Sequence, residues 1–403
     1  MSVNFEKLKA FGKYRQLFLD FVVKEEVCNL SCDYCMNEHT QLKDDHGIER
    51  IGGKLKFKLD ELDELVYQAG YRLKAAIDKV LSEYQKIFDT PVLKISGGEI
   101  LLVKNISELI KRQSDSFEVI QLLTNGTLIN QDFINQIKHI NNLHIQLSLD
   151  GHTLEMNYNR VKTQALQDRL LRVLDSLVEN DIITEIYCVI NKLNVNGLPD
   201  FAEYLSSRYK GKVQLFPFPV RQHAGKTLLP EEDNLQGISE IIQHYDSYIS
   251  ILPPLPYMEE LYNFIRMRKR ALRCLIPLVA AQVFDDGVIT PCPNCWTVKT
   301  GNLIESSEGV AENLGKSRVY KLMTNCPPIA PFCFNCFTEV DVVNLYFQDR
   351  VELKELAESR PLYRGPRVQS TLSELKKIFT SMDFESSDIK KLSTQNISGV
   401  NSL

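Results

Sequence analysis

Short runs of apolar, often β-branched residues recur along the first 220 residues, and turn-forming or polar residues separate them. Six runs predict β-strands: Leu17–Val23, Val92–Ser96, Glu118–Leu123, His144–Leu149, Thr184–Ile190 and Val213–Phe218. Between most of them apolar residues recur with helical spacing, at Leu59–Phe88, Ile106–Ile110, Phe133–Ile137, Leu166–Leu177 and Leu198–Leu205. Strands that alternate with helices form right-handed βαβ units around a parallel sheet. We therefore expect an α/β fold, a (β/α)6 partial TIM barrel that is open on one side, with its site at the carboxyl ends of the strands.

The alternation stops near residue 225. A helical pattern covers about 235–271, and a cysteine-rich segment with a hairpin signal at Asp286-Gly287 follows. Beyond Cys336 the chain is charged, and KLSTQNISGVNSL at its end is typical of a disordered tail. We expect a barrel domain over 1–230, a helical connection over 231–272, a small cysteine-rich domain over 273–345, and a C-terminal helical segment with a tail over 346–403.

Composition excludes several classes of function. The 403 residues are 44% hydrophobic and 25% charged, with a formal charge of -5, which is ordinary for a globular protein. Nucleic acid is not an expected partner because the chain has no basic excess. No apolar run reaches the length of about 18 residues that a spanning helix needs, and the N-terminus MSVNFEKLKAFGKYRQ lacks a signal-peptide core. The expected location is the cytoplasm.

The ten cysteines are clustered. Three lie within residues 28–35, six within 274–336, and Cys188 lies alone in a strand, where we expect a small core residue. In a reducing compartment, clustered cysteines more often bind metal or perform chemistry than form disulfides.

The first cluster, Cys28-Asn-Leu-Ser-Cys32-Asp-Tyr-Cys35, directly follows the first strand. Three thiolates in one short loop can ligate three irons of a cubane cluster. Without a fourth cysteine nearby, one iron stays open to a ligand that is not protein. The alternative is a zinc site, for which His39 would be the fourth ligand.

This CxxxCxxC spacing, with an aromatic residue before the last cysteine, resembles the radical S-adenosylmethionine (radical SAM) superfamily. The resemblance implies an enzyme in which a [4Fe–4S] cluster binds S-adenosylmethionine at its open iron. Reductive cleavage then gives a 5′-deoxyadenosyl radical that abstracts a hydrogen atom from the substrate. It also implies an electron donor such as flavodoxin or ferredoxin.

Further residues that resemble cofactor-binding positions of this family follow the predicted strands. They are Gly97, Gly98 and Glu99 of a GGE motif, Thr124 and Asn125 of Thr-Asn-Gly, Ser148 of Ser-Leu-Asp-Gly, Arg160 and Asn191. The resemblance assigns the GGE motif to the methionyl amino group, Arg160 to the carboxylate, and Asn191 to the adenine. Ile100 replaces the proline that usually follows the GGE motif.

The second cluster reads Cys274-x17-Cys292-x2-Cys295 and Cys326-x6-Cys333-x2-Cys336. It resembles the SPASM and twitch extensions of radical SAM enzymes, which hold auxiliary [4Fe–4S] clusters, and the twitch arrangement is the better match. The resemblance implies that Cys274, Cys292, Cys333 and Cys336 ligate one closed cluster for electron transfer, with Cys295 and Cys326 as extra thiols or replacement ligands. The alternative is a zinc ribbon built from the two CxxC pairs.

The sequence leaves the substrate open between three hypotheses: a ribosomally made peptide, a sugar or aminocyclitol that the enzyme dehydrogenates, or no substrate at all in a zinc-binding scaffold. Sulfatase-maturing relatives carry an acidic residue after the hairpin cysteine, where this chain has Pro293. Arg221, His223, Tyr158 and Glu339 are candidates for the barrel mouth, but a solvated surface role is the favoured interpretation of each. Trp296 is expected to pack against the second cluster.

Overall fold

The fold is described from a computed structural model. The structure describes residues 5–23, 27–35, 77–220, 228–292, 300–314, 323–324, 333 and 336–382. Several predictions fall outside these residues: most of the helix over 59–88, the C-terminal tail, and the positions of His39, Arg221, His223, Pro293, Cys295, Trp296 and Cys326.

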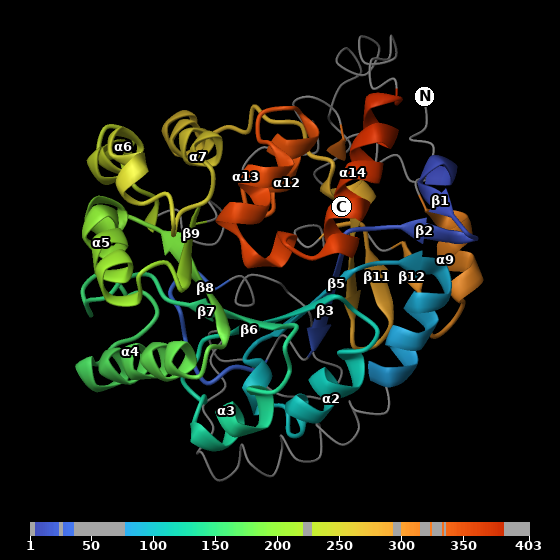
Figure 1. Cartoon of the computed structure of the whole chain (residues 1–403), viewed down its shortest axis with the longest axis horizontal. Helices are drawn as coiled ribbons and strands as arrows, with labels where there is room; N and C mark the ends of the chain where they lie inside the picture. Colours follow the sequence, from blue (N-terminus) through green and yellow to red (C-terminus); the bar gives the residue numbers. More distant parts are fainter. Residues whose placement is uncertain are drawn as a thin grey trace, which may run out of the picture.

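The six predicted strands are confirmed and form one curved parallel sheet (Figure 1). They are β3 (Phe18–Val23), β5 (Val92–Gly97), β6 (Val119–Thr124), β7 (Leu143–Ser148), β8 (Ile183–Ile190) and β9 (Val213–Pro219), each hydrogen-bonded to the next in chain order. The connections contain the helix over 77–87, α2 (Ile106–Gln113), α3 (Gln131–Ile137), α4 (Gln164–Glu179) and α5 (Leu198–Tyr209). The helices begin where their sequence caps them: Asn130 and Thr163 accept hydrogen bonds from backbone N–H groups in the first turns of α3 and α4. The α/β partial barrel is therefore the observed architecture.

A seventh parallel strand, which the sequence analysis did not predict, extends the sheet at its other edge. Strand β10 (Ala280–Phe284) pairs in parallel with β3, and β11 (Val288–Thr290) and β12 (Gly301–Asn302) continue antiparallel beyond it. The predicted hairpin at Asp286-Gly287 joins β10 to β11, and Gly287 there has a φ of +86°. The sheet thus continues from the barrel into the cysteine-rich segment. The domain boundaries at 230, 272 and 345 stay a prediction.

The concave face of the sheet carries a row of polar side chains, which we call the polar belt. Its members are Gln282, Asp20, Lys94, Gln121 and His144, in register on five neighbouring strands, and Gln146, Glu185 and Gln214 on the last three. Gln121 reaches across β7 and donates to Glu185 on β8 over 2.6 Å. Toward the carboxyl ends of the strands the inner face becomes more open, since Ser96, Leu123, Ser148 and Phe218 are half-buried.

Most of the other described elements are helices. Helices α6 (Gln236–Gln243) and α7 (Leu255–Met267) lie within the predicted helical region 235–271. Then follow α8 (Ile276–Val279), α9 (Ser307–Asn313), α12 (Asp341–Phe347), α13 (Leu353–Ser359), the 3-10 turn η7 (Pro361–Tyr363) and α14 (Pro366–Thr380). A small second sheet contains β1 (Lys9–Ala10), β2 (Lys13–Arg15) and β4 (Phe88–Asp89). None of the described helices is both long enough and apolar enough to cross a bilayer.

The C-terminal segment closes the concave side of the sheet, where α12, α13 and α14 lie in Figure 1. Arg360 is fully buried, and its guanidinium donates to the Glu185 carboxylate over 2.7–3.0 Å and to the Tyr187 hydroxyl. Farther down, the backbone N–H groups of Arg367 and Val368 donate to Glu118, next to the amino end of β6. The segment therefore covers the end of the barrel opposite to the cysteine loop.

Candidate active site

The first three cysteines lie in the loop that follows β3. Each of the three cysteines is half-buried. The loop is bonded on two sides: Glu99 N donates to the Val27 carbonyl over 2.7 Å, and Asp33 N donates to the Asn159 carbonyl over 2.9 Å. It is thus attached to the carboxyl end of β5 and to the segment beyond β7.

The Thr-Asn-Gly segment after β6 holds the same loop through side chains. Asn125 Nδ2 donates to Asn29 Oδ1 over 2.9 Å and lies 3.8 Å from Cys28 Sγ. Asn29 in turn donates to Thr127 Oγ1 over 2.8 Å. Gly126 has a φ of +78°, and a Cβ there would lie 2.3 Å from Leu147, so this turn requires glycine. The segment is an anchor for the cysteine loop as well as a turn.

Glu99 of the GGE motif lies between β5 and β6. One carboxylate oxygen accepts from the Thr124 hydroxyl over 2.6 Å and from Leu101 N over 3.0 Å, and the other accepts from Asn125 N over 2.7 Å. Burial raises the pKa of Glu99, and these hydrogen bonds oppose the rise. Glu99 therefore fixes the two strand ends relative to each other, and its predicted contact with an amino group would add a further partner.

Asp150, after β7, joins the cysteine loop to Arg160. Its carboxylate accepts from the Tyr34 hydroxyl, from Arg160 Nη2 over 3.1 Å and from Val189 N over 2.9 Å. Tyr34 is the aromatic residue before Cys35, and the Arg160 guanidinium lies 5.6 Å from the centre of its ring. Asp150 belongs to the Ser-Leu-Asp-Gly motif, but the sequence alone did not predict it as a site residue.

Arg160 is a buried cation with one N–H donor that no described residue accepts. The residue is buried, yet its Nε has no hydrogen-bond partner among the described residues. Burial alone would lower the pKa of the guanidinium, but the Asp150 carboxylate holds it well above the ordinary value. A buried cation with an unpaired N–H is the group that a carboxylate ligand would satisfy. Asn191 is bonded to the residue that precedes Arg160, because Asn159 Nδ2 donates to its Oδ1 over 3.0 Å.

The thiols themselves fit ligation by iron. Burial raises the pKa of Cys28 to about 12 and that of Cys32 to about 11, so a thiolate at either position needs positive charge such as a metal supplies. Among the described residues no three His, Cys, Asp or Glu side chains converge on a single ion. The three thiolates of a cubane each ligate a different iron and need no such convergence.

The second cysteine group is partly described. Cys274 and Cys336 are half-buried, and Cys292 and Cys333 are buried. Arg270, three residues after the end of α7, contacts the segments of Cys274 and Cys336. Its Nη1 donates to the Cys336 carbonyl over 2.8 Å, and its Nε donates to the Leu272 carbonyl over 2.8 Å. Sequence reasoning missed Arg270, because a basic residue among Arg266, Arg268 and Arg273 has the pattern of a solvated surface.

The remaining candidates divide between core and surface. Cys188 is fully buried in the core, as predicted. Glu339 faces the polar belt and pairs with Lys94 over 3.2 Å. Tyr158 is 48% exposed, with Lys162 over its ring, so it lies at the surface.

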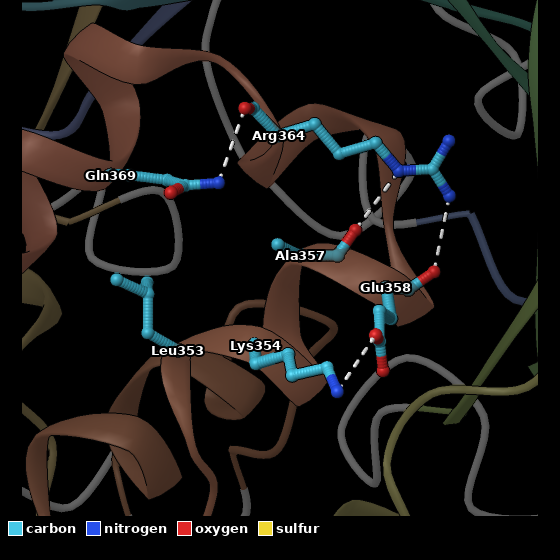
Figure 2. Close-up of a pocket in the computed structure, with 6 residues that line it drawn as sticks. All are labelled: Leu353, Lys354, Ala357, Glu358, Arg364 and Gln369. Carbon is cyan, nitrogen blue, oxygen red and sulfur yellow. Dashed lines mark hydrogen bonds and ion pairs between the residues drawn. The ribbon is translucent and has the colours of Figure 1, made fainter.

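A hollow of about 610 Å³ lies between α13 and α14 (Figure 2). Its polar groups are used within the fold: Arg364 donates to the Ala357 and Glu358 carbonyls over 3.0 and 3.1 Å, and Lys354 lies 3.7 Å from Glu358. None of the predicted site residues lines it.

Comparisons with known proteins support the family resemblance that the cysteine loop carries. Residues 24–205 match the model of the "Radical SAM superfamily". The Fe-coproporphyrin III synthase of Methanosarcina barkeri is 30% identical over 54% of this chain and 48% of its own length. The GTP 3′,8-cyclase of Campylobacter jejuni is 28% identical over 68% of this chain and 73% of its own. The mycofactocin maturase MftC of Mycobacterium tuberculosis is 26% identical over 47% of this chain and 41% of its own.

Solved structures show a more distant likeness. The structure described as native anSMEcpe with bound AdoMet and Cp18Cys peptide is 17% identical, with a TM-score of 0.48, over 89% of this chain and 99% of that one. The chain spans about half the length of the Methanosarcina relative.

Proposed function

We propose that this chain is a radical SAM enzyme, because residues 24–205 match the model of that superfamily. In this proposal Cys28, Cys32 and Cys35 ligate a [4Fe–4S] cluster that binds S-adenosylmethionine, and the enzyme abstracts a hydrogen atom from its substrate. When bound, the reduced cluster and S-adenosylmethionine together supply a 5′-deoxyadenosyl radical. Gly97, Gly98, Glu99, Thr124, Asn125, Ser148, Arg160 and Asn191 form the cofactor site in this proposal.

One observation supports this assignment above the others. Hydrogen bonds join the cysteine loop to three neighbouring strand ends, through Asn125, Glu99 and Asp150. Arg160 follows Asn159, which accepts from the cysteine loop, and no described residue accepts from its Nε. A positively charged donor near the Cys32 thiol suits the carboxylate of a methionyl group that is bound at an open iron.

The second cysteine group is proposed to hold an auxiliary cluster through Cys274, Cys292, Cys333 and Cys336, with Cys295 and Cys326 as further thiols. In this role the substrate radical would give one electron to the second site and one proton to solvent, which leaves an oxidised product. A flavodoxin or ferredoxin would supply the electron for S-adenosylmethionine cleavage.

The proposed substrate is a ribosomally made peptide, in line with the similarity to the mycofactocin maturase. A sugar or aminocyclitol is the second candidate. It is favoured by the match to a GTP cyclase over a larger share of the chain. Addition of candidate peptides and cyclitols, followed by mass spectrometry of the products, separates the two. A non-enzymatic scaffold is not proposed, because the family is one of enzymes.

Anaerobic purification and reduction test the proposal. We expect about eight iron and eight sulfide atoms per chain, as two [4Fe–4S] clusters require, and formation of 5′-deoxyadenosine from S-adenosylmethionine. Cys32→Ala should abolish 5′-deoxyadenosine, whereas Cys188→Ala, which changes a core thiol, should retain it. Formation of 5′-deoxyadenosine at the normal rate by Cys32→Ala would refute the assignment of the loop.

A further inference from the structure

A hydrogen-bonded unit of Arg270, Asp341 and Asn344 lies between the two cysteine segments that come together at Cys274 and Cys336. All three side chains are at most 2% exposed. Asp341 is the first residue of α12, and Asn344 lies one turn later on the same helix. The unit therefore connects the segment after α7, which contains Cys274, to the segment of Cys336 and to α12.

The first contact is a buried ion pair. Both Asp341 carboxylate oxygens accept from Arg270, Oδ2 from Nη1 over 3.0 Å and Oδ1 from Nη2. Burial alone would lower the pKa of Arg270, but the Asp341 carboxylate and the neighbouring Cys274 and Cys336 thiols raise it. The guanidinium therefore stays charged beside both thiols, and Asp341 holds it in position.

The second contact reaches a sulfur. Asn344 Nδ2 donates to Asp341 Oδ1 over 2.7 Å and lies 3.8 Å from Cys274 Sγ, within hydrogen-bonding reach of that atom. Asn344 Oδ1 accepts from Leu275 N over 2.8 Å. That bond and the bond to Asp341 fix the orientation of the amide, so an N–H group rather than the amide oxygen faces Cys274.

We propose that Arg270, Asp341 and Asn344 are positioning residues for the second cysteine group, and that the Asn344 N–H group raises the reduction potential of the cluster bound there. Hydrogen bonds to a ligating sulfur stabilise the reduced, more negative cluster and so raise its potential. The nearby guanidinium acts in the same direction. A raised potential suits a site that accepts an electron from a substrate radical. This inference rests on the proposed auxiliary cluster.

The test measures potential rather than activity. The full chain with Cys28, Cys32 and Cys35 changed to Ala leaves the second cysteine group as the site for a cluster. In this background, iron and sulfide are assayed after anaerobic reconstitution, and the midpoint potential is measured by EPR-monitored titration. We expect about four iron atoms per chain and a lower midpoint potential in Asn344→Leu than in its parent.

Gln348→Leu is the matched control. Gln348 also lies at α12, and its Nε2 donates to the Arg273 carbonyl over 3.2 Å, next to Cys274 but to a backbone oxygen. Its removal should leave the potential unchanged. If Asn344→Leu does not fold, Asn344→Ala leaves room for water at Leu275 N and should also lower the potential.

The possible outcomes distinguish a failure of the inference about Asn344 from a failure of the proposed auxiliary cluster. Iron at the expected level with the same potential in parent and Asn344 variants would overturn this inference and leave the auxiliary cluster standing. A parent that binds no iron after reconstitution would overturn both. An equal fall of potential in Gln348→Leu would show a general effect of α12 and also overturn it.

Discussion

Arg160 and Arg270 accompany the two cysteine groups in different ways. Arg160 donates to Asp150 with one terminal nitrogen, while its buried Nε lacks a partner among the described residues. Arg270 uses Nε and both terminal nitrogens within the protein, on Leu272, Cys336 and Asp341. A buried donor without a partner costs free energy that a bound ligand can recover. A donor whose hydrogen bonds are all made within the protein stabilises the fold around it instead. This difference supports the proposal that the first group binds a small molecule and that the second holds a closed cluster.

The largest expected effect comes from breaking the closed site. Arg270→Ala leaves the Asp341 carboxylate buried and unpaired, which should cost about 3–5 kcal/mol of the free energy of unfolding. Denaturant unfolding under anaerobic conditions measures this loss. Arg160→Lys, which keeps the charge at the open site, should lose much less stability and instead weaken binding of S-adenosylmethionine. Equal stability losses in the two variants would contradict the comparison.

Asp150→Asn tests the open site through a residue that positions its neighbours. The variant weakens the support of both Tyr34 and Arg160, and loss of such support typically lowers activity about 10- to 100-fold. We expect that fall in the rate of 5′-deoxyadenosine formation, with unchanged iron content. Asp175→Asn is a matched control, because Asp175 also accepts from an arginine and a tyrosine, Arg208 and Tyr209, but at the surface. A similar fall in the control would remove Asp150 from the site.

Lowering the pH should reduce the free energy of unfolding, through His144 on the sheet that carries both sites. Burial lowers the pKa of His144 to about 4, so the unfolded chain binds the proton from its ordinary pKa of about 6.5 downward, well before the folded chain does. Stability from this group is complete above pH 6.5 and is lost as the pH falls toward 4, by about 3 kcal/mol at most. His144→Gln should reduce the difference in unfolding free energy between pH 7 and pH 5. If the variant shows the same difference in unfolding free energy as the parent, groups other than His144 cause the loss of stability at low pH.

The smallest effect is expected at the rim of the open site. Lys162 and Asp33 pair over 2.6 Å, but both side chains are 41% exposed, and such pairs contribute about 0–1 kcal/mol. Lys162→Ala should leave unfolding and 5′-deoxyadenosine formation close to the parent values. A fall comparable to that of Asp150→Asn would show that the open site extends to the surface.

Local pattern predicted much of this molecule, because strands, turns and clustered cysteines are properties of neighbouring residues. The six strands and the hairpin at Asp286-Gly287 were predicted in this way. Arg270, Asp341 and Asn344 were not, since their meaning depends on partners about 70 residues away. The seventh strand, β10, was missed because its pairing with β3 joins residues more than 250 positions apart.

The burial of the polar belt could not be predicted from the sequence. Lys94, Gln121 and Glu185 alternate with apolar residues along their strands, and such alternation ordinarily indicates a face turned to water. In this chain the polar face lies inside the curve of the sheet and meets Arg360 and Glu339 from the C-terminal part. The alternation was visible in the sequence, but the segment that covers it could not be identified there.

The insertion of Arg360 also sets an order of events during synthesis. Glu185 leaves the ribosome 175 residues before the arginine that neutralises it, and strands β3 to β9 are complete by residue 219. A contact so distant along the chain forms late and slowly. The nascent barrel must therefore exist for a time with its concave side uncovered and a carboxylate waiting for its partner. A ribosome that stalls before residue 360 would release a chain of this kind, which chaperones and proteases would be expected to recognise.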